Sequence, residues 1–156
     1  MKSFFEKNQN IKRVNKPWGY ELWIASDLNN KTYAMKEIFI KTGFKTSFQF
    51  HEYKEECNYI ISGKGTLLLS ENKIDVNKFK NNEYTNENLK DMLNNLKSYE
   101  LAKGSSFHIQ PLYIHSVISI DNLIMIESSS LHLNDVYRIL DEHGRSHGKI
   151  ESEHKN

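Results

Sequence analysis

The feature that most constrains the fold is a series of short strand-like segments separated by turn residues. They are Tyr20–Ala25, Tyr33–Ile40, Ser47–His51, Asn58–Ser62, Gly65–Ser70, Ser106–Ile109, Ser116–Ile120 and Leu123–Ser128. Each has the length and the β-branched or aromatic content of a strand. Many short strands at regular spacing predict an all-β sandwich or barrel.

One polar stretch, residues 71–97, departs from this rhythm and is rich in Asn and Lys. Within it Leu89, Met92, Leu93 and Leu96 recur at helical spacing, which predicts one short helix over Glu87–Leu96. We expect its apolar stripe to dock on the barrel. The predicted organisation is an N-terminal extension over 1–15, a domain over 16–145 that carries this insertion, and a polar tail over 146–156.

Composition excludes several classes of function. The chain has 21 Lys and Arg against 20 Asp and Glu, so it carries no general field for nucleic acid or an anionic membrane. The longest apolar runs, Leu22–Ala25 and Leu123–Ile126, are too short to span a bilayer. The first residues lack the apolar region of a secretory signal, and the single Cys57 cannot form an internal disulfide. We therefore expect a cytoplasmic protein.

Four side chains could form a metal site. Gln49 and His51 are two residues apart on a predicted strand, so they share a face. Glu56 follows after a tight turn, and His115 begins a later strand. An amide oxygen, two imidazoles and a carboxylate suit one divalent metal ion, with zinc as the first expectation and Fe, Mn, Ni or Co as alternatives.

The same residues resemble the first cupin motif. Gly43, His51, Glu56 and Gly63 fall in register with it, and Gln49 replaces its first His. A Gln-x-His-x-x-Arg-x-Glu row followed by an apolar run and Ser-Gly is similar to the type II mannose-6-phosphate isomerases. Lys54 stands here in place of that Arg.

A second motif and both flanks extend the resemblance. Gly104, Ser106, Ile109 and His115 match the second cupin motif, whereas Gln110 and Leu112 replace its Pro and Gly. Lys16–Glu21 resembles the entry of that family's cupin domain, and Asn134–Arg145 resembles its closing segment. The resemblance implies a cupin double-stranded β-helix, a jelly-roll-like barrel, with its metal on Gln49, His51, Glu56 and His115.

The implied function is a metal-dependent isomerase or epimerase of a sugar or sugar phosphate. Two alternatives stay open: a non-catalytic cupin that binds a sugar or sugar nucleotide, and another metal-dependent cupin enzyme such as an iron dioxygenase. Cupins often pair, and with the apolar Phe4–Phe5 this gives the expectation of a homodimer.

Further site residues follow from the strand pattern and the resemblance. Lys36 shares a strand face with Ala34 and Ile38, and could move a proton or hold a phosphate. The expected catalytic residues are Lys36, Glu56, Arg138 and Arg145, and the expected substrate-binding residues are Trp18, Tyr20, Lys54 and Tyr59. The alternatives are a solvated Lys36, arginines in ion pairs with nearby carboxylates, and aromatic rings that only pack.

Overall fold

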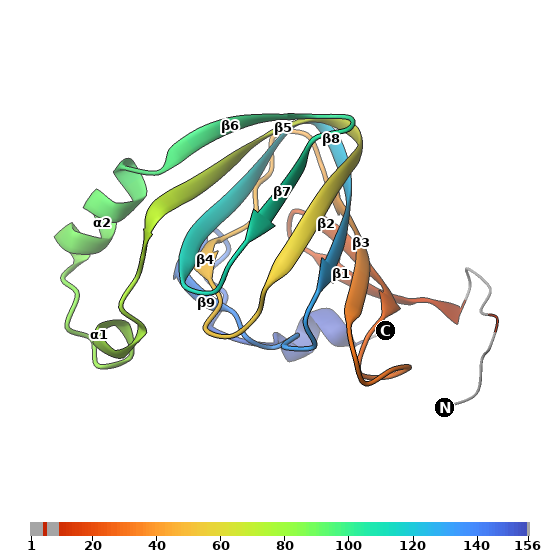
Figure 1. Cartoon of the computed structure of the whole chain (residues 1–156), viewed down its shortest axis with the longest axis horizontal. Helices are drawn as coiled ribbons and strands as arrows, with labels where there is room; N and C mark the ends of the chain where they lie inside the picture. Colours follow the sequence, from red (N-terminus) through yellow and green to blue (C-terminus); the bar gives the residue numbers. More distant parts are fainter. Residues whose placement is uncertain (1–4, 6–9, 156) are drawn as a thin grey trace.

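The computed structural model describes Phe5 and residues 10–155, and its strands form one curled antiparallel sheet (Figure 1). The strands are β1 (Lys12–Lys16), β2 (Gly19–Ala25), β3 (Ala34–Ile40), β4 (Phe48–Phe50), β5 (Glu56–Lys73), β6 (Lys97–Ala102), β7 (Ser106–Ile109), β8 (Tyr113–Ser129) and β9 (Tyr137–Leu140). One path through the sheet runs β1-β2-β3-β8-β4-β9, and β5 pairs with β6, β7 and β8. The all-β prediction is confirmed.

Two strands are longer than the sequence pattern predicts. Asn58–Ser62 and Gly65–Ser70 are parts of the continuous β5, and Ser116–Ile120 and Leu123–Ser128 are parts of β8. The residues interpreted as turns are bends, where the pairing of the two strands shifts register. Gly63 makes the bend in β5 possible because its φ is +85°, a conformation that other residues rarely adopt.

Alternation along the strands places one face of the sheet in the core. In β3 the side chains of Ala34, Lys36, Ile38 and Ile40 are buried, while the residues between them are partly exposed. The main apolar cluster gathers Trp18, Ile38, Ile40, Ile60, Leu67, Leu101, Phe107, Ile109, Val117, Leu123 and Met125. Lys36 therefore lies on the inward face with Ala34 and Ile38, and the alternative of a solvated Lys36 is wrong.

The polar insertion carries two helices, not one. They are α1 (Val76–Lys80) and α2 (Asn86–Asn94), which lie together at one end of the sheet (Figure 1). The first is too short to show helical periodicity, and its start depends on the Asp75 side chain, which accepts two backbone N–H bonds. From α2 and its end, Met92, Leu93 and Leu96 pack against a second buried cluster of Phe50, Ile74 and Ile114. Docking on the sheet is confirmed for these three residues of the stripe, whereas Leu89 is not part of the packed cluster.

Both ends of the chain take part in the fold more than expected. The segment interpreted as an extension supplies β1, which pairs with β2 at the sheet edge. The polar tail forms a 3-10 helix, η2 (Glu151–His154), which contacts β1. Of the apolar pair invoked for a dimer, Phe4 lies outside the described residues and Phe5 is exposed. Within the described chain no helix has the length and apolar character needed to cross a membrane.

Candidate metal centre

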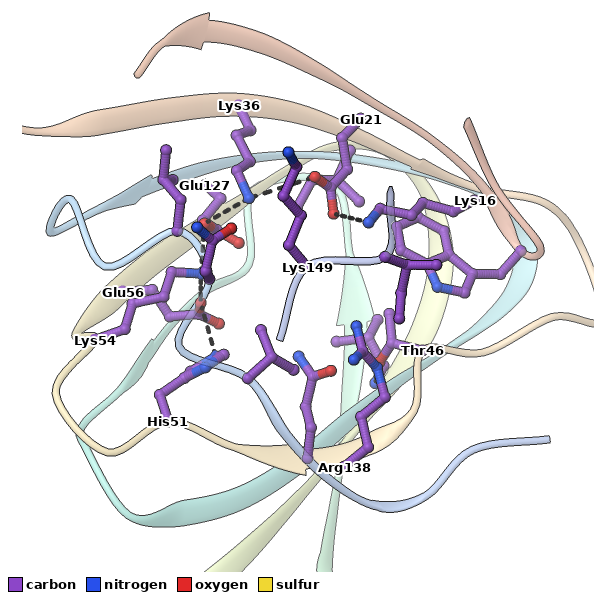
Figure 2. Close-up of a pocket in the computed structure, with 18 of the residues that line it drawn as sticks. Lys16, Glu21, Lys36, Thr46, His51, Lys54, Glu56, Glu127, Arg138 and Lys149 are labelled. Atoms are coloured by element: carbon purple, nitrogen blue, oxygen red, sulfur yellow. Dashed lines mark hydrogen bonds and ion pairs between the residues drawn. The ribbon is translucent and has the colours of Figure 1, made fainter. Parts of the chain in front are cut away.

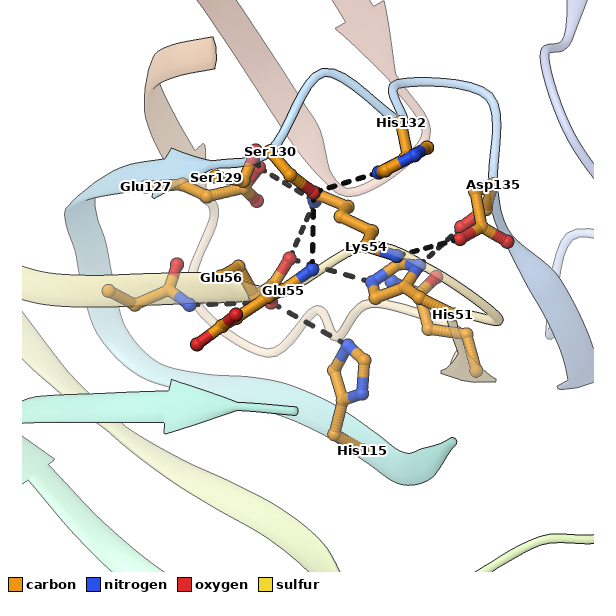
Figure 3. A network of polar contacts seen from close by, with 12 residues as sticks. His51, Lys54, Glu55, Glu56, His115, Glu127, Ser129, Ser130, His132 and Asp135 are labelled. Atoms are coloured by element: carbon orange, nitrogen blue, oxygen red, sulfur yellow. Dashed lines mark hydrogen bonds and ion pairs between the residues drawn. The ribbon is translucent and has the colours of Figure 1, made fainter. Parts of the chain in front are cut away.

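Three predicted ligands converge inside the sheet (Figure 3). His51, Glu56 and His115 are 1%, 6% and 3% exposed, and one ligand atom from each lies within 4.8 Å of the others. His51 Nε2 is 3.5 Å from Glu56 Oε2, and His115 Nε2 is 3.8 Å from Glu56 Oε1. Each imidazole therefore faces a different oxygen of one carboxylate.

Backbone carbonyl groups orient the two histidine rings through their Nδ1 atoms. His51 Nδ1 contacts the backbone carbonyl of Asp135, and His115 Nδ1 lies 3.1 Å from the carbonyl of Tyr113. A carbonyl accepts only, so both Nδ1 atoms carry the hydrogen and both Nε2 lone pairs point to the centre. Neither Nε2 has a hydrogen-bond partner among the residues that the structure describes, although both are buried. Two orphaned imidazole nitrogens around a carboxylate fit a divalent metal ion.

Charges around the triad favour its metal-binding protonation states. Burial alone raises the pKa of Glu56, but the Lys54 ammonium and the nearby histidines outweigh it and hold the pKa well below its usual range. Burial lowers the pKa of His115 to about 4, against the opposing effect of Glu56. The carboxylate is thus charged and this imidazole neutral at neutral pH, as metal ligands must be.

Strand register and one loop contact assemble the triad. Gln49 in β4 pairs with His115 in β8, which brings the first motif beside the second. The turn between β4 and β5 is held by Asp135, whose carboxylate accepts the backbone N–H groups of Glu52, Tyr53 and Lys54. Those hydrogen bonds lower the pKa of Asp135 although burial opposes them. The closing segment of the sequence thus fixes the position of the first motif.

The triad lies in a pocket that holds most of the predicted site residues (Figure 2). Gln49, Lys36, Lys54, Trp18, Arg138 and Arg145 line it together with the triad. Gln49 is half-buried, and its Oε1 accepts a hydrogen bond of 2.6 Å from Ser47 Oγ. The amide thus lines the pocket beside the triad while its oxygen is engaged by a neighbouring hydroxyl.

The two arginines differ in their partners. Arg138 Nη1 donates to the backbone carbonyls of Ser146 and Gly148, while its buried Nε has no partner among the described residues. Arg145 is held by Asp141, with Nη2–Oδ1 at 2.7 Å, and by Glu153 at 3.2 Å. Arg145 thus secures the tail segment, and Arg138 has a free donor at the pocket.

The expected substrate-binding residues fall in different places. Trp18 lines the pocket but also belongs to the apolar core. Tyr20 stacks on Phe39 outside the pocket, and Tyr59 is 47% exposed on β5, also outside it. The positions of the two tyrosines in β2 and β5 direct them away from the inward face, so the structure does not bring them to the triad. Lys54 is buried and bridges two carboxylates.

Among the pocket residues that sequence reasoning missed are Glu21, Trp23 and Glu127. Trp23 Nε1 donates to Glu21 Oε2 at 2.8 Å, and Lys36 Nζ lies 3.3 Å from the same oxygen. Burial raises the pKa of Glu21, but Lys36 and Lys16 outweigh it and lower the pKa to about 2. A readable signal existed: Glu127 shares its strand face with Leu123 and Met125, where a carboxylate needs a buried partner.

No protein-family model matches the chain, and no curated protein matches it in sequence. Solved structures do resemble it. Ectoine synthase from P. lautus matches with a TM-score of 0.61 at 11% identity, over 82% of this chain and 78% of that one. The capsular polysaccharide assembling protein CapF from Staphylococcus aureus matches at 0.60 and 14%, over 82% of this chain and 31% of CapF. The chain thus spans about a third of the length of CapF.

A third match is a candidate sugar phosphate isomerase from Acidithiobacillus ferrooxidans. Its TM-score is 0.50 at 19% identity, over 81% of this chain and 74% of that one. Oxalate decarboxylase from Lactobacillus farciminis matches at 0.59 and 14%, over 83% of this chain. These likenesses show the cupin fold, which hosts several different chemistries.

Proposed function

We propose that this chain is a metal-dependent enzyme that isomerises or epimerises a sugar or sugar phosphate. One observation carries the proposal: the His51, Glu56 and His115 triad shares a buried pocket with Lys36 and Arg138. A ligand site, a group that can transfer a proton and a guanidinium thus face one enclosed space. The resemblance to the type II mannose-6-phosphate isomerases selects this chemistry among those of cupin enzymes.

The metal ligands in the proposal are His51, Glu56 and His115, with Gln49 as a fourth. When bound, a divalent ion supplies electrophilic polarisation of the substrate carbonyl. Gln49 would have to release the hydroxyl of Ser47 for its Oε1 to serve as a ligand. If it keeps that contact, it acts beside the ion through hydrogen bonds.

Lys36 is the residue to which we assign proton transfer. An aldose–ketose exchange removes a proton from the carbon beside a carbonyl and returns it to the neighbouring carbon. Lys36 Nζ lies at the pocket between two carboxylates, 3.3 Å from Glu21 and 3.9 Å from Glu127 (Figure 2). Those carboxylates hold the amine in position at the pocket.

Arg138 is the residue to which we assign anion binding. A guanidinium offers donors in a fixed fork that suits phosphate or a pair of sugar hydroxyls. Its Nη1 is anchored by the tail carbonyls, so the remaining donors are held in place. Arg145 forms ion pairs with Asp141 and Glu153 and supports the tail. In this proposal it holds the tail in place and does not contact the substrate.

The test uses metal-loaded protein and mannose 6-phosphate with a panel of related sugars and sugar phosphates in deuterated water. We expect NMR to show product and solvent deuterium at the carbon beside the carbonyl. Lys36→Met should abolish both while metal analysis shows the wild-type content. His51→Ala should lose the metal, and His108→Ala, on the surface beside Cys57, should keep it. Metal-loaded protein that converts no sugar of the panel and exchanges no proton contradicts the proposal.

A non-catalytic sugar-binding cupin is the second candidate, and one contact favours it. Lys54 Nζ lies 2.5 Å from Glu56 Oε2, so the acidic ligand already has a cation. Such a pocket can be stable and can bind a sugar without metal. Under this alternative the NMR panel shows line broadening by one sugar, with no turnover and no deuterium exchange, and His51→Ala leaves that binding intact.

A further inference from the structure

We propose that Lys54 is a built-in counter-ion that competes with the metal for Glu56 and thereby limits how tightly a divalent ion binds. The inference depends on the metal site of the proposed function, but not on isomerase chemistry. Lys54 is buried, and its Nζ lies 2.5 Å from Glu56 Oε2 (Figure 3). His51 Nε2 faces the same oxygen at 3.5 Å. The Lys54 ammonium and a metal ion coordinated by His51 therefore compete for the same oxygen, Glu56 Oε2.

The Glu127 carboxylate is a second ion-pair partner for Lys54. Glu127 Oε1 lies 2.7 Å from Lys54 Nζ and is not part of the triad. An ammonium and a divalent cation a few ångströms apart in a buried site repel strongly. Metal binding therefore requires Lys54 to leave Glu56 and pair with Glu127 alone. The two arrangements differ by one ion pair, whose loss reduces the affinity for metal.

No other lysine of the described chain shares this position. Lys36 pairs with Glu21 and Glu127, and Lys16 pairs with Glu21 and Glu153; neither has an ion pair with Glu56. The backbone N–H of Lys54 is bound separately, to Asp135 at 2.9 Å. A methionine at position 54 keeps that contact and a similar volume, so it removes the charge with little change in shape.

The experiment compares zinc affinity in three full-length proteins: wild type, Lys54→Met and Lys36→Met. Competition against a chromophoric chelator measures the dissociation constant, and the visible absorption of bound Co²⁺ reports the ligand set. We expect Lys54→Met to bind zinc about tenfold to a hundredfold more tightly, the range of second-shell effects. Lys36→Met, which removes the same charge without touching Glu56, should change affinity by less than about threefold.

A second variant should change the zinc affinity in the opposite direction to Lys54→Met. Glu127→Gln removes the charged alternative partner of Lys54, so zinc should bind about tenfold more weakly. In the Lys54→Met background the same substitution should have a much smaller effect, because the two residues act through each other. The melting temperature of metal-free Lys54→Met should fall, because Glu56 loses its lysine partner and Glu127 keeps only Lys36, at 3.9 Å. Added zinc should restore it.

The outcomes separate this inference from the proposed function. Equal or weaker zinc binding by Lys54→Met overturns the role of Lys54 and leaves the isomerase proposal standing. Zinc binding by Lys54→Met but not by wild type supports Lys54 as the competitor and overturns the metal-dependent enzyme. Absence of binding in every form overturns both. Should Lys54→Met fail to fold, an unchanged zinc affinity of Glu127→Gln overturns the inference.

Discussion

At the scale of residues, the unusual feature is a chain of buried charges that runs from the pocket wall to the triad. Glu21, Lys36, Glu127, Lys54 and Glu56 alternate in sign, with successive ion pairs of 3.3, 3.9, 2.7 and 2.5 Å. Buried ion pairs are weak sources of stability, because desolvation offsets most of their attraction. Their concentration around one pocket therefore supports a functional rather than a structural origin.

This charge chain predicts a dependence of stability on pH at Glu21. The pKa of Glu21 is about 2 in the folded protein against an ordinary 4.5. Its stabilisation is present above pH 4.5 and is lost as pH falls towards 2, because the unfolded chain then binds the extra proton. Between pH 5 and pH 3, the wild type should therefore lose about 2 kcal/mol more unfolding free energy than Glu21→Gln.

Urea titrations at pH 5, 4 and 3 measure this difference. Glu142→Gln is the matched control, since it removes a carboxylate whose side chain is 56% exposed and paired with Lys45. Screening by solvent should leave its effect on the pH dependence small. Parallel pH profiles for wild type and Glu21→Gln would show that Glu21 has no such role.

At the scale of elements, two local conformations make the triad possible. The turn between β4 and β5 is held by Asp135, and the loop before β8 contains Leu112 at φ +75°. Leu112 occupies the place where the resembling family has glycine, and its left-handed conformation explains that preference. Its N–H donates to the carbonyl of His51 at 2.7 Å, so this strained loop directly supports a ligand.

Removal of the Asp135 carboxylate should loosen the turn and the ligand together. Asp135→Ala leaves the N–H groups of Glu52, Tyr53 and Lys54 without their acceptor, so unfolding free energy should fall by about 2 kcal/mol or more. Zinc affinity should fall as well, because His51 is held from the same loop. Chemical denaturation and zinc titration measure the two effects, with the exposed Asp27→Ala as control. A loss of stability without weaker zinc binding would show that the turn held by Asp135 does not position the metal ligands.

The bend of β5 should tolerate no side chain at Gly63. A Cβ there would lie 2.2 Å from the carbonyl oxygen of Asn122 and 2.3 Å from that of Asp121, both in the backbone of β8. Gly43 also has a positive φ, +81°, but a Cβ there meets nothing within 4 Å. Gly63→Ala should therefore cost at least about 3 kcal/mol, and Gly43→Ala about 1 kcal/mol, the cost of conformation alone. Thermal unfolding measures both, and equal losses would contradict the steric argument.

At the scale of the whole molecule, the tail closes the pocket. Ile150 and His154 line it, His154 packs edge-on against Trp23 at 5.1 Å, and Glu153 pairs with Lys16 and Arg145. The tail thereby connects β1, at one edge of the sheet, to the segment after β9, at the end of the strand path. These contacts make the tail an ordered part of the pocket wall.

Truncation after Arg145 should open the pocket without removing the triad. The deletion removes the carbonyls that hold Arg138 and the carboxylate of Glu153. Zinc release to an excess of chelator should become several-fold faster. The fluorescence of the two tryptophans, which both line the pocket, should shift to longer wavelength as water enters it. Lys155→Ala, at an exposed position of the tail outside the pocket, is the control. An unchanged release rate would show that the tail does not restrict access.

The sequence by itself determined the strand content, the strand face that Lys36 shares with Ala34 and Ile38, and the residue types of the candidate metal centre. These follow from local rules: a period of two along a strand, and the preference of divalent metals for imidazole and carboxylate. The spacing of Gly43, His51, Glu56 and Gly63 was also enough to indicate the cupin fold.

Only the tertiary structure decided which charged side chains form ion pairs. Glu21, Lys36, Glu127 and Lys54 come from three strands and a turn, and no spacing along the chain predicts that they lie in one pocket. The same holds for Asp135 with the first motif, for the tail over the pocket, and for Tyr20 and Tyr59 outside it. The physical reason is that strand register and chain closure set these distances, and both depend on how the whole sheet packs.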